Sequence, residues 1–390
     1  MEWKEVRLGD VCEIKGGKRL PKGINLITQK NSHPYIRVRD LGKSKTLELN
    51  SSYEYVDEIT QKQIQRYITL KGDILISIVG TIGLIAIVGG SLNGANLTEN
   101  CVKLVKLDNI DSEYLYYYLK SPLGQQNISR GTVGAVQAKL PIKNIQEFNI
   151  NCPVLISDQR RIASILSSLD RKIELNNKIN ADLEEMAQAI FKNWFVDFEP
   201  FKDGKFVDSE LGMIPEGWKV GTLGELCNFK RGKNLLTKNA IDEGVPVVAG
   251  GLEPSCYHNV ANTGAPVITV SGSGANAGFM RMYHVPVWAS DCSFIDISCE
   301  NFYFVYCFLK VNSKLLKHAQ TGAVQPHVKP SDIHDFELVI PDKENIYEFQ
   351  DKVKPFFDKI AAIQKENSRL STLRDTLLPR LMSGELEIPE

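Results

Sequence analysis

The chain has 390 residues, a hydrophobic content of 43% and a formal net charge of −1 at pH 7. This length exceeds one hydrophobic core, so we expect two or more domains. No apolar run reaches the roughly 18 residues that a membrane span needs, and residues 1–10 lack the apolar stretch of a secretory signal. We therefore expect a cytoplasmic protein with no membrane segment.

The first 45 residues are basic although the whole chain is nearly neutral. They hold eleven Lys or Arg and five acidic residues. A total charge near zero argues mildly against nucleic acid as a partner, but the total hides local fields of this kind. The start of the chain is therefore a candidate basic surface.

The eight cysteines are scattered along the chain. They form no C-x-x-C pair, and no His stands at zinc-finger spacing. The pattern predicts reduced, mostly buried thiols and no metal site.

In the first half, apolar β-branched runs predict strands at 35–38, 73–80 and 102–107, and the segment 112–121 predicts a short helix. A long helix should follow over 156–195, because apolar residues recur there about every 3.5 positions. The stripe consists of Ile162, Ile165, Leu169, Ile173, Asn176, Leu183, Met186 and Ile190.

Aromatic residues are dense around the end of this helix and in the joint that follows it, residues 196–217. They are Phe191, Trp194, Phe195, Phe198 and Phe201. Such density is unusual for a solvated linker, so the segment should pack against the domains or a partner.

The second half repeats this plan, with strands predicted at 245–250, 266–272 and 336–341 and a short helix at 301–312. A second long helix is predicted over 343–386. Its stripe consists of Val353, Phe356, Ile360, Ile363, Asn367, Leu370, Leu373, Leu377 and Leu381.

The two long helices have polar flanks that leave only a narrow apolar seam. Two narrow seams of similar length most simply pair with each other, with Asn176 and Asn367 inside the seam, where a polar residue can fix the register. The alternative is that each helix packs on its own globular domain.

An internal repeat organises the whole chain. Four echoes occur in the same order, and the spacing between the copies falls from 215 to about 188 residues. The echoes are 3–18 with 218–233, a Gly-rich turn after an apolar run near Gly72 and again near Ala265, Gly-Ala-Val-Gln at Gly134 and Gly322, and the two long helices.

No catalytic constellation stands out. The glycines at Gly16 lack P-loop spacing, and those at Gly272 precede a β-like run instead of the helix that a dinucleotide fingerprint requires. Asp342 lies just before a predicted helix. We expect it to cap this helix and not to take part in cutting phosphodiester bonds. We therefore predict a non-catalytic chain with no cofactor of its own.

Duplicated polar and basic loops remain. Glutamine can bind a base edge through its amide, while Lys and Arg can hold phosphates or guanine. The alternative for the two turn glutamines is a structural turn in which they bond backbone. The candidate DNA-binding residues are Lys15, Lys18, Arg19, Lys22, the strand charges Arg37 and Arg39, Thr81, Arg130, Gln137, Lys139, Lys230, Arg231, Lys233, Ser271, Ser273, Asn276, Gln325, His327 and Lys329.

Four features carry a resemblance to a known family: the joint FKNWFVDFEPF with ELGMIPEGWK, the ending LLPRLMSGEL at 377–386, the Gly-Ala-Val-Gln turns and the W-K-x-x-x-L-G-D/E openings. Together they make nearly the whole chain resemble the specificity subunit of type I restriction-modification systems. The family's base-reading positions carry no fixed motif, so the candidate contacts rest on the loops alone.

The resemblance implies an α+β protein with an internal pseudo-two-fold repeat. Two mixed α/β target-recognition domains would be separated by a pair of long antiparallel coiled-coil helices, and would read a bipartite, asymmetric site on double-stranded DNA. The implied order is recognition domain 1–155, spacer helix 156–195, joint 196–217, recognition domain 218–342 and spacer helix 343–386.

The resemblance also implies partners. Two methyltransferase subunits would bind S-adenosylmethionine, and restriction subunits would use ATP, so catalysis would lie outside this chain. Two alternatives stay open: the specificity subunit of a related type II restriction enzyme, and a two-domain coiled-coil scaffold that binds no DNA.

Overall fold

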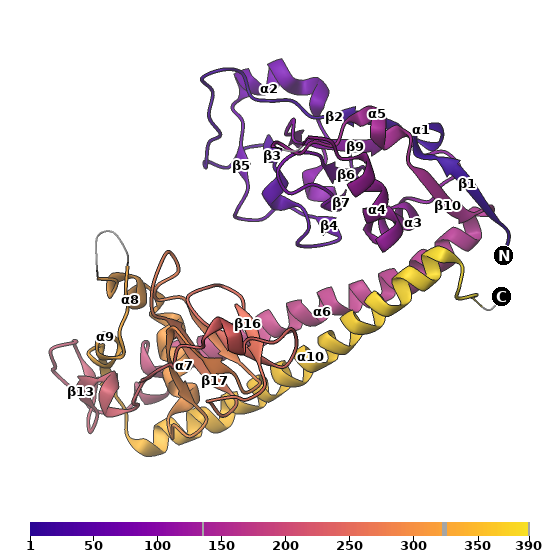
Figure 1. Ribbon diagram of the computed structural model, residues 1–390. Coiled ribbons are helices and arrows are strands. Elements are labelled where there is room, and N and C mark those ends of the chain that lie inside the picture. The colour runs from indigo at the N-terminus through magenta and orange to yellow at the C-terminus, as the bar shows by residue number, and fades with distance from the viewer. Residues whose placement is uncertain (135, 322–325, 389–390) are drawn as a thin grey trace. The chain divides into compact units, whose positions relative to one another are not determined.

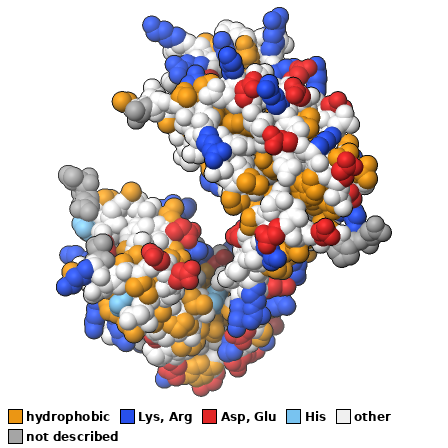
Figure 2. Space-filling model, turned by 45° about the vertical axis from the view of Figure 1, so that its right-hand side comes forward, with side chains coloured by type: hydrophobic (Ala, Val, Ile, Leu, Met, Phe, Trp, Pro, Cys, Tyr) orange, Lys and Arg blue, Asp and Glu red, His pale blue; other side chains and the backbone are white. Residues whose placement is uncertain are grey.

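The structure is a computed structural model that describes residues 1–134, 136–321 and 326–388. It divides into two compact units: unit 1 holds Met1–Leu175 and Glu366–Glu390, and unit 2 holds Asn176–Lys365. Each unit combines one globular domain with part of both long helices (Figure 1). Figure 2 shows charged side chains of both signs scattered over the visible face of each unit.

Unit 1 is built on a five-stranded sheet beside a three-stranded one, with a separate strand pair close to the chain start. The five-stranded sheet has the order β2 (Glu13–Gly16), β9 (Cys101–Val105), β6 (Ile74–Ser77), β7 (Ile85–Val88) and β4 (Thr46–Leu47). The smaller sheet has the order β5 (Glu54–Tyr55), β3 (Pro34–Ile36) and β8 (Asn96–Leu97), and the pair is β1 (Trp3–Arg7) with β10 (Asn149–Pro153). Its short helices are α1 (Leu8–Val11), α2 (Glu58–Ile64), α3 (Ser112–Lys120), α4 (Pro122–Gly131) and α5 (Ile142–Gln146).

Unit 2 repeats this topology with two differences among the described strands: β4 has no counterpart in unit 2, and unit 2 has an additional strand pair. Its larger sheet has the order β14 (Lys230–Arg231), β20 (Cys292–Asp296), β17 (Val267–Ser271) and β18 (Met280–Tyr283). Its smaller sheet has the order β16 (Cys256–His258), β15 (Val245–Val248) and β19 (Trp288–Ala289), and its strand pairs are β13 (Lys219–Thr222) with β21 (Glu337–Ile340) and β11 (Phe206–Val207) with β12 (Ile214–Pro215). Its short helices are α7 (Phe302–Val311), α8 (Ser313–His318) and α9 (Pro330–His334). The predicted internal repeat is therefore confirmed in the strand order.

The central strands β6, β7 and β17 are buried at every position and are mostly apolar, as expected for strands that are covered on both faces. Along β6, Ile74 and Ile76 join the core that contains α3, whereas Leu75 between them joins the core on the other face. Successive side chains of the strand point to opposite faces of the sheet, so β6 contributes to two cores. Every strand and short helix predicted from an apolar run is present.

The long helices are α6 (Ile156–Phe195) and α10 (Lys343–Ser383). In unit 1 they run antiparallel, since Asp170 meets Arg374 (Oδ1–Nη1 2.8 Å) and Lys172 meets Glu366 (Nζ–Oε1 3.6 Å). The hydroxyl of Tyr117 on α3 donates to the other oxygen of Asp170 at 2.6 Å. The predicted pairing of the helices is therefore confirmed, and the pair is tied to the domain.

Both helices also complete the core of each unit. In unit 1, the buried residues Ile162 and Leu166 of α6 and Leu381 of α10 belong to the core that covers the sheet. The two readings of the apolar seam are thus both partly correct, because each helix contacts its partner helix and a globular domain.

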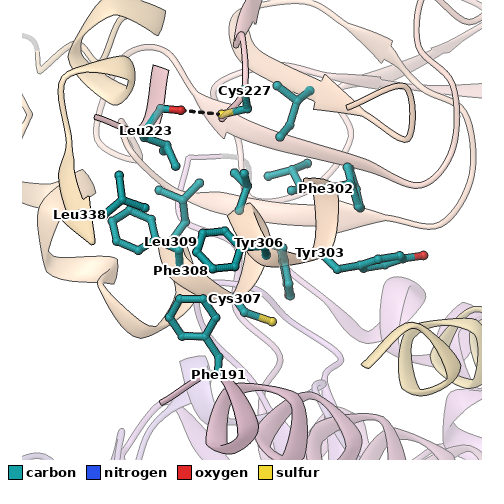
Figure 3. Close-up of a cluster of buried hydrophobic side chains, with 14 of the residues drawn as sticks. Phe191, Leu223, Cys227, Phe302, Tyr303, Tyr306, Cys307, Phe308, Leu309 and Leu338 are labelled. Carbon is teal, nitrogen blue, oxygen red and sulfur yellow. Dashed lines mark hydrogen bonds between the residues drawn. The ribbon is translucent and has the colours of Figure 1, made fainter. Parts of the chain in front are cut away.

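Unit 2 gathers the aromatic residues into one cluster. The ring of Phe349 on α10 lies 5.6 Å from that of Phe191 and 5.2 Å from that of Phe195, both on α6. Figure 3 shows Phe191 pointing from its helix towards Phe308 of α7. In the joint, the rings of Phe198 and Phe201 pack on Trp218 at 5.6 Å and 4.8 Å. The expectation that the joint is packed is confirmed.

Two positions of the predicted stripes are wrong. Met186 and Leu373 are 49% and 47% exposed. Near Met186 the buried positions are Ala187 and Phe191, which face the core of unit 2. A strict 3.5-residue spacing drifts from a straight helix, so the buried face turns along the helix towards the domain.

All eight cysteines are free, and six of them are buried. Burial raises the pKa of the Cys12 thiol from an ordinary value of 9.0 to about 12. Burial also accounts for the raised pKa of Cys101 and of Cys292, each about 12. The expectation of mostly buried thiols is confirmed. None of the described helices is long and apolar enough to cross a bilayer.

The helix pair generates the first prediction. Ile363 on α10 is 4% exposed, so Ile363→Asp should place an unpaired charge in a buried seam and lower the free energy of unfolding by about 3–5 kcal/mol. Leu373→Asp makes the same change at an exposed position of the same helix, and should cost less than about 1 kcal/mol. Denaturant unfolding of the two variants measures the difference. Equal losses would show that Ile363 is not part of a buried seam.

Candidate nucleic-acid interface

The fold brings two echoes of the repeat together in unit 1. The turn after β6 meets the Gly-Ala-Val-Gln turn, where Val79 forms a β-bridge with Lys139. The backbone N–H of Leu140 donates to the carbonyl of Ile78 at 3.0 Å. Gly80, next in the turn, has φ +81°, a conformation that favours glycine. Residues some 60 positions apart therefore share one surface.

Unit 2 repeats this arrangement with different side chains. Ser273 forms the β-bridge with His327, and the N–H of Val328 donates to the carbonyl of Gly272 at 3.1 Å. Gly274 follows with φ +80°. The predicted contact Gln325 lies outside the described residues. We define the two surfaces as turn clusters: residues 78–83 with 132–134 and 136–140 in unit 1, and residues 272–276 with 326–329 in unit 2.

The basic loops are seated beside the turn clusters by close backbone approaches. The N–H of Gly17 donates to the carbonyl of Cys101 at 3.0 Å, and that of Gly232 donates to the carbonyl of Cys292 at 2.8 Å. A Cβ added at Gly17 would lie 2.0 Å from the Thr98 carbonyl oxygen, and one added at Gly232 would lie 2.2 Å from that of Ser290. Only glycine fits at these two equivalent positions.

The cationic side chains on and directly after strands β2 and β14 are exposed, and several are paired. In unit 1, Lys15 contacts Glu13 at 2.8 Å, and Arg19 contacts Glu99 at 2.7 Å. Figure 2 shows Lys and Arg side chains along the outer edge of unit 1, at the top of the view. The other exposed cations are Lys18 and Lys22, which follow β2, Lys233, which follows β14, and Lys230 and Arg231, which form β14 itself. Arg231 contacts Asp291 at 2.7 Å.

Arg37 and Arg39 are not on a strand, which corrects the sequence reading. Strand β3 ends at Ile36, and a 3-10 helix follows over Val38–Asp40. Both guanidinium groups bind the Glu54 carboxylate, Arg39 at 2.7 Å. The strand predicted over 35–38 therefore ends two residues early. The Asp40 carboxylate accepts the Arg37 backbone N–H at 2.7 Å and closes a turn there.

The turn clusters and the residues next to them include exposed and buried candidates. Gln137, Lys139 and Lys329 are exposed, and so are Thr81 and Arg130. Ser271 is 3% exposed, and its hydroxyl donates to the Gly250 carbonyl at 3.3 Å. Asn276 is half-buried and donates its amide to the same carbonyl at 3.3 Å. Ser271 therefore supports the loop instead of facing solvent.

Two carboxylates beside these loops were missed from the sequence. Glu99 holds Arg19, and Asp291 holds Arg231 at 2.7 Å. Asp291 also accepts a hydrogen bond from the Ser273 hydroxyl. These partners lie 80 and 60 residues apart in the chain, so no local pattern could have paired them.

The interface suits binding better than bond-making chemistry. Cationic side chains, an exposed amide and hydroxyls surround loops that a rigid sheet positions. Within the described part of the chain, no group of three or more His, Cys, Asp or Glu could hold a metal ion.

The seating of the basic loops gives the second prediction. Gly17→Ala and Gly232→Ala should each lower the free energy of unfolding by about 1–3 kcal/mol, because the added methyl group would overlap a carbonyl oxygen. Gly90→Ala is the control, since nothing lies within 4 Å of its added Cβ. Unfolding curves of the three variants test this. Unchanged stability of both first variants would contradict the close approach.

The comparisons with known proteins agree with the repeat. Residues 1–185 and 215–372 match the family described as type I restriction modification DNA specificity domain. The type I restriction enzyme MjaIX specificity subunit of Methanocaldococcus jannaschii is 29% identical, over 100% of this chain and 94% of that protein. The HindI specificity subunit of Haemophilus influenzae is 26% identical, over 64% of this chain and 71% of that protein.

A solved structure shares the fold. The S subunit of a type I restriction-modification system from M. genitalium superposes with a TM-score of 0.59 at 20% identity, covering 98% of this chain and 96% of that one. The family match spans both copies of the repeat and most of both long helices. The chain therefore belongs to the family of type I restriction-modification specificity subunits.

Proposed function

We propose that the chain is the DNA-specificity subunit of a type I restriction-modification complex and that it reads a bipartite DNA site, one half with each unit. The observation that carries this proposal is the duplicated turn cluster beside a basic loop. A single reading surface would not need the same backbone arrangement twice.

The two half-sites should differ in sequence. The two turn clusters share backbone hydrogen bonds, but Val79 and Lys139 in unit 1 stand where Ser273 and His327 stand in unit 2. Bases are distinguished by the donors and acceptors that a side chain presents in the groove. Equal backbones with unequal side chains therefore support an asymmetric site.

The remaining candidates divide by chemistry. The exposed amide of Gln137 suits a base edge, whereas the lysines of the basic loops suit phosphates. Arg37 and Arg39 share one carboxylate on the smaller sheet, so they suit phosphate contacts that fix the register on the duplex.

The proposal includes partners and a location. The MjaIX relative, matched over 94% of its length, is named a specificity subunit of a type I restriction enzyme, which supports assembly with other subunits of such an enzyme. We assign these partners as two methyltransferase subunits and restriction subunits. Those partners would bind S-adenosylmethionine and use ATP. We place the complex in the cytoplasm, where it would meet double-stranded DNA.

A selection experiment tests the proposal. The full chain, co-expressed with its methyltransferase partner, is incubated with a randomised duplex library at two salt concentrations, and bound DNA is sequenced. We expect two different short sequences separated by a fixed gap, with an affinity that falls as salt rises, because phosphate contacts release counterions. Binding without sequence preference or salt dependence would favour the scaffold alternative. Co-purification of a type II nuclease would favour the alternative that the chain is the specificity subunit of a type II restriction enzyme.

The third prediction concerns the independence of the two half-sites. Lys329→Ala should change recognition of the half-site read by unit 2, by roughly 1–3 kcal/mol if the side chain contacts a base. Gln137→Ala should do the same for the half-site read by unit 1. Each variant is the control for the other, since both side chains are exposed in matching turn clusters. A change in both half-sites by either variant would contradict two separate readers.

The fourth prediction concerns catalysis. The purified chain alone should neither methylate nor cleave DNA, because we assign both reactions to the partner subunits. Tritiated methyl transfer from S-adenosylmethionine and gel analysis of plasmid DNA measure the two activities. The chain with its methyltransferase partner is the positive control. Methyl transfer by the isolated chain would overturn the assignment.

A further inference from the structure

Each unit carries one arginine that a carboxylate holds beside its turn cluster. Arg19 Nε lies 2.7 Å from Glu99 Oε1, and Arg231 Nη2 lies 2.7 Å from Asp291 Oδ1. The arginine side chains are 80% and 49% exposed, whereas both carboxylate side chains are 30% exposed. An accessible guanidinium is thus fixed by a less accessible anion.

Both pairs lie at the same place in the fold. The carbonyl of Asn100, next to Glu99, accepts the N–H of Ile78 at 2.8 Å, and the carbonyl of Asp291 accepts the N–H of Gly272 at 3.1 Å. Ile78 and Gly272 begin the two turn clusters. Each arginine therefore borders the surface that we propose reads bases.

The pairs are nevertheless not copies of each other. When the seated glycines are matched, Arg19 comes two residues after Gly17, whereas Arg231 comes one residue before Gly232. The positions of the carboxylates also differ, since Glu99 precedes Cys101 by two residues and Asp291 precedes the equivalent Cys292 by one. Different positions thus supply the same pair in each unit, which a shared repeat alone does not explain.

Each carboxylate is held through its second oxygen as well. Thr98 Oγ1 donates to Glu99 Oε2 at 3.1 Å, and the Ser273 hydroxyl donates to Asp291 Oδ2. Burial acts to raise the pKa of Glu99, but hydrogen bonds led by that from Arg19 keep the pKa below its ordinary value. The Glu99 carboxylate therefore stays charged at neutral pH.

Stability does not account for these pairs. Ion pairs with a largely exposed partner contribute little to folding. A carboxylate close to a DNA-binding surface also repels phosphates, which weakens binding. A held guanidinium, in contrast, keeps further N–H donors free, and the bidentate contact of arginine with guanine O6 and N7 depends on orientation.

We propose that Arg19 and Arg231 each read a guanine, one in each half-site, and that Glu99 and Asp291 are positioning residues that orient the two guanidinium groups. This inference rests on the proposed function. It predicts a guanine in each half-site whose recognition depends on one arginine and one carboxylate.

The test uses the full chain with its methyltransferase partner and the randomised duplex library. Arg231→Ala should lower the preference for one guanine in one half-site by about tenfold or more. Asp291→Asn should lower the preference at the same base and leave the other positions unchanged. Non-specific affinity should stay equal or rise, because a negative charge is removed near the phosphates. Glu99→Gln is the matched control, and should act only on the other half-site.

The double variant separates positioning from a structural role. If Asp291 acts through Arg231, adding Asp291→Asn to Arg231→Ala changes nothing further at that base. A further loss of preference in the double variant would overturn the inference. So would a loss spread over all positions together with a lower thermal midpoint, or an effect of Arg231→Ala at a base other than guanine. A wild-type chain that selects a two-part site while Arg231→Ala leaves it intact defeats this inference alone. A wild-type chain that selects no sequence defeats the proposed function too.

Discussion

The structure depends on the burial of both long helices in both cores. Leu166 and Leu381 complete the core of unit 1, and Phe191 and Phe349 complete that of unit 2. Neither globular domain closes its apolar surface with its own strands alone. Since large buried side chains contribute most to the hydrophobic free energy, each domain is fixed to the helix pair by the interaction that also folds it.

A fixed backbone with variable side chains follows from this arrangement. The seated glycines Gly17 and Gly232 and the bridges of the two turn clusters repeat the same hydrogen bonds. The side chains on that backbone differ between the units. The arginine–carboxylate pairs occupy different positions, and the residues at the β-bridges are not the same. Within each unit, the repeated backbone can thus present a different set of side chains on the surface that we propose reads DNA, because loops on a folded scaffold carry such contacts.

Much of this fold could be predicted from the sequence, for reasons that are local. Ile74, Leu75 and Ile76 form a continuous apolar run, and the long helices show a clear period, so the type of these elements followed from pattern alone. Met186 and Leu373 were misplaced because the buried face turns as the helix approaches the domain. The roles of Glu99, Asp291 and the buried Ser271 could not be predicted, since they depend on contacts between segments far apart in the chain.

The central claim is that the chain contains two readers that act independently. It is tested most directly by DNA affinities of wild type, Gln137→Ala, Lys329→Ala and the double variant, measured on the selected site at one salt concentration. These residues belong to separate units with separate cores, so the two losses should add within about 0.3–0.5 kcal/mol. An interaction energy above about 1 kcal/mol would show that the two surfaces read DNA as one coupled site.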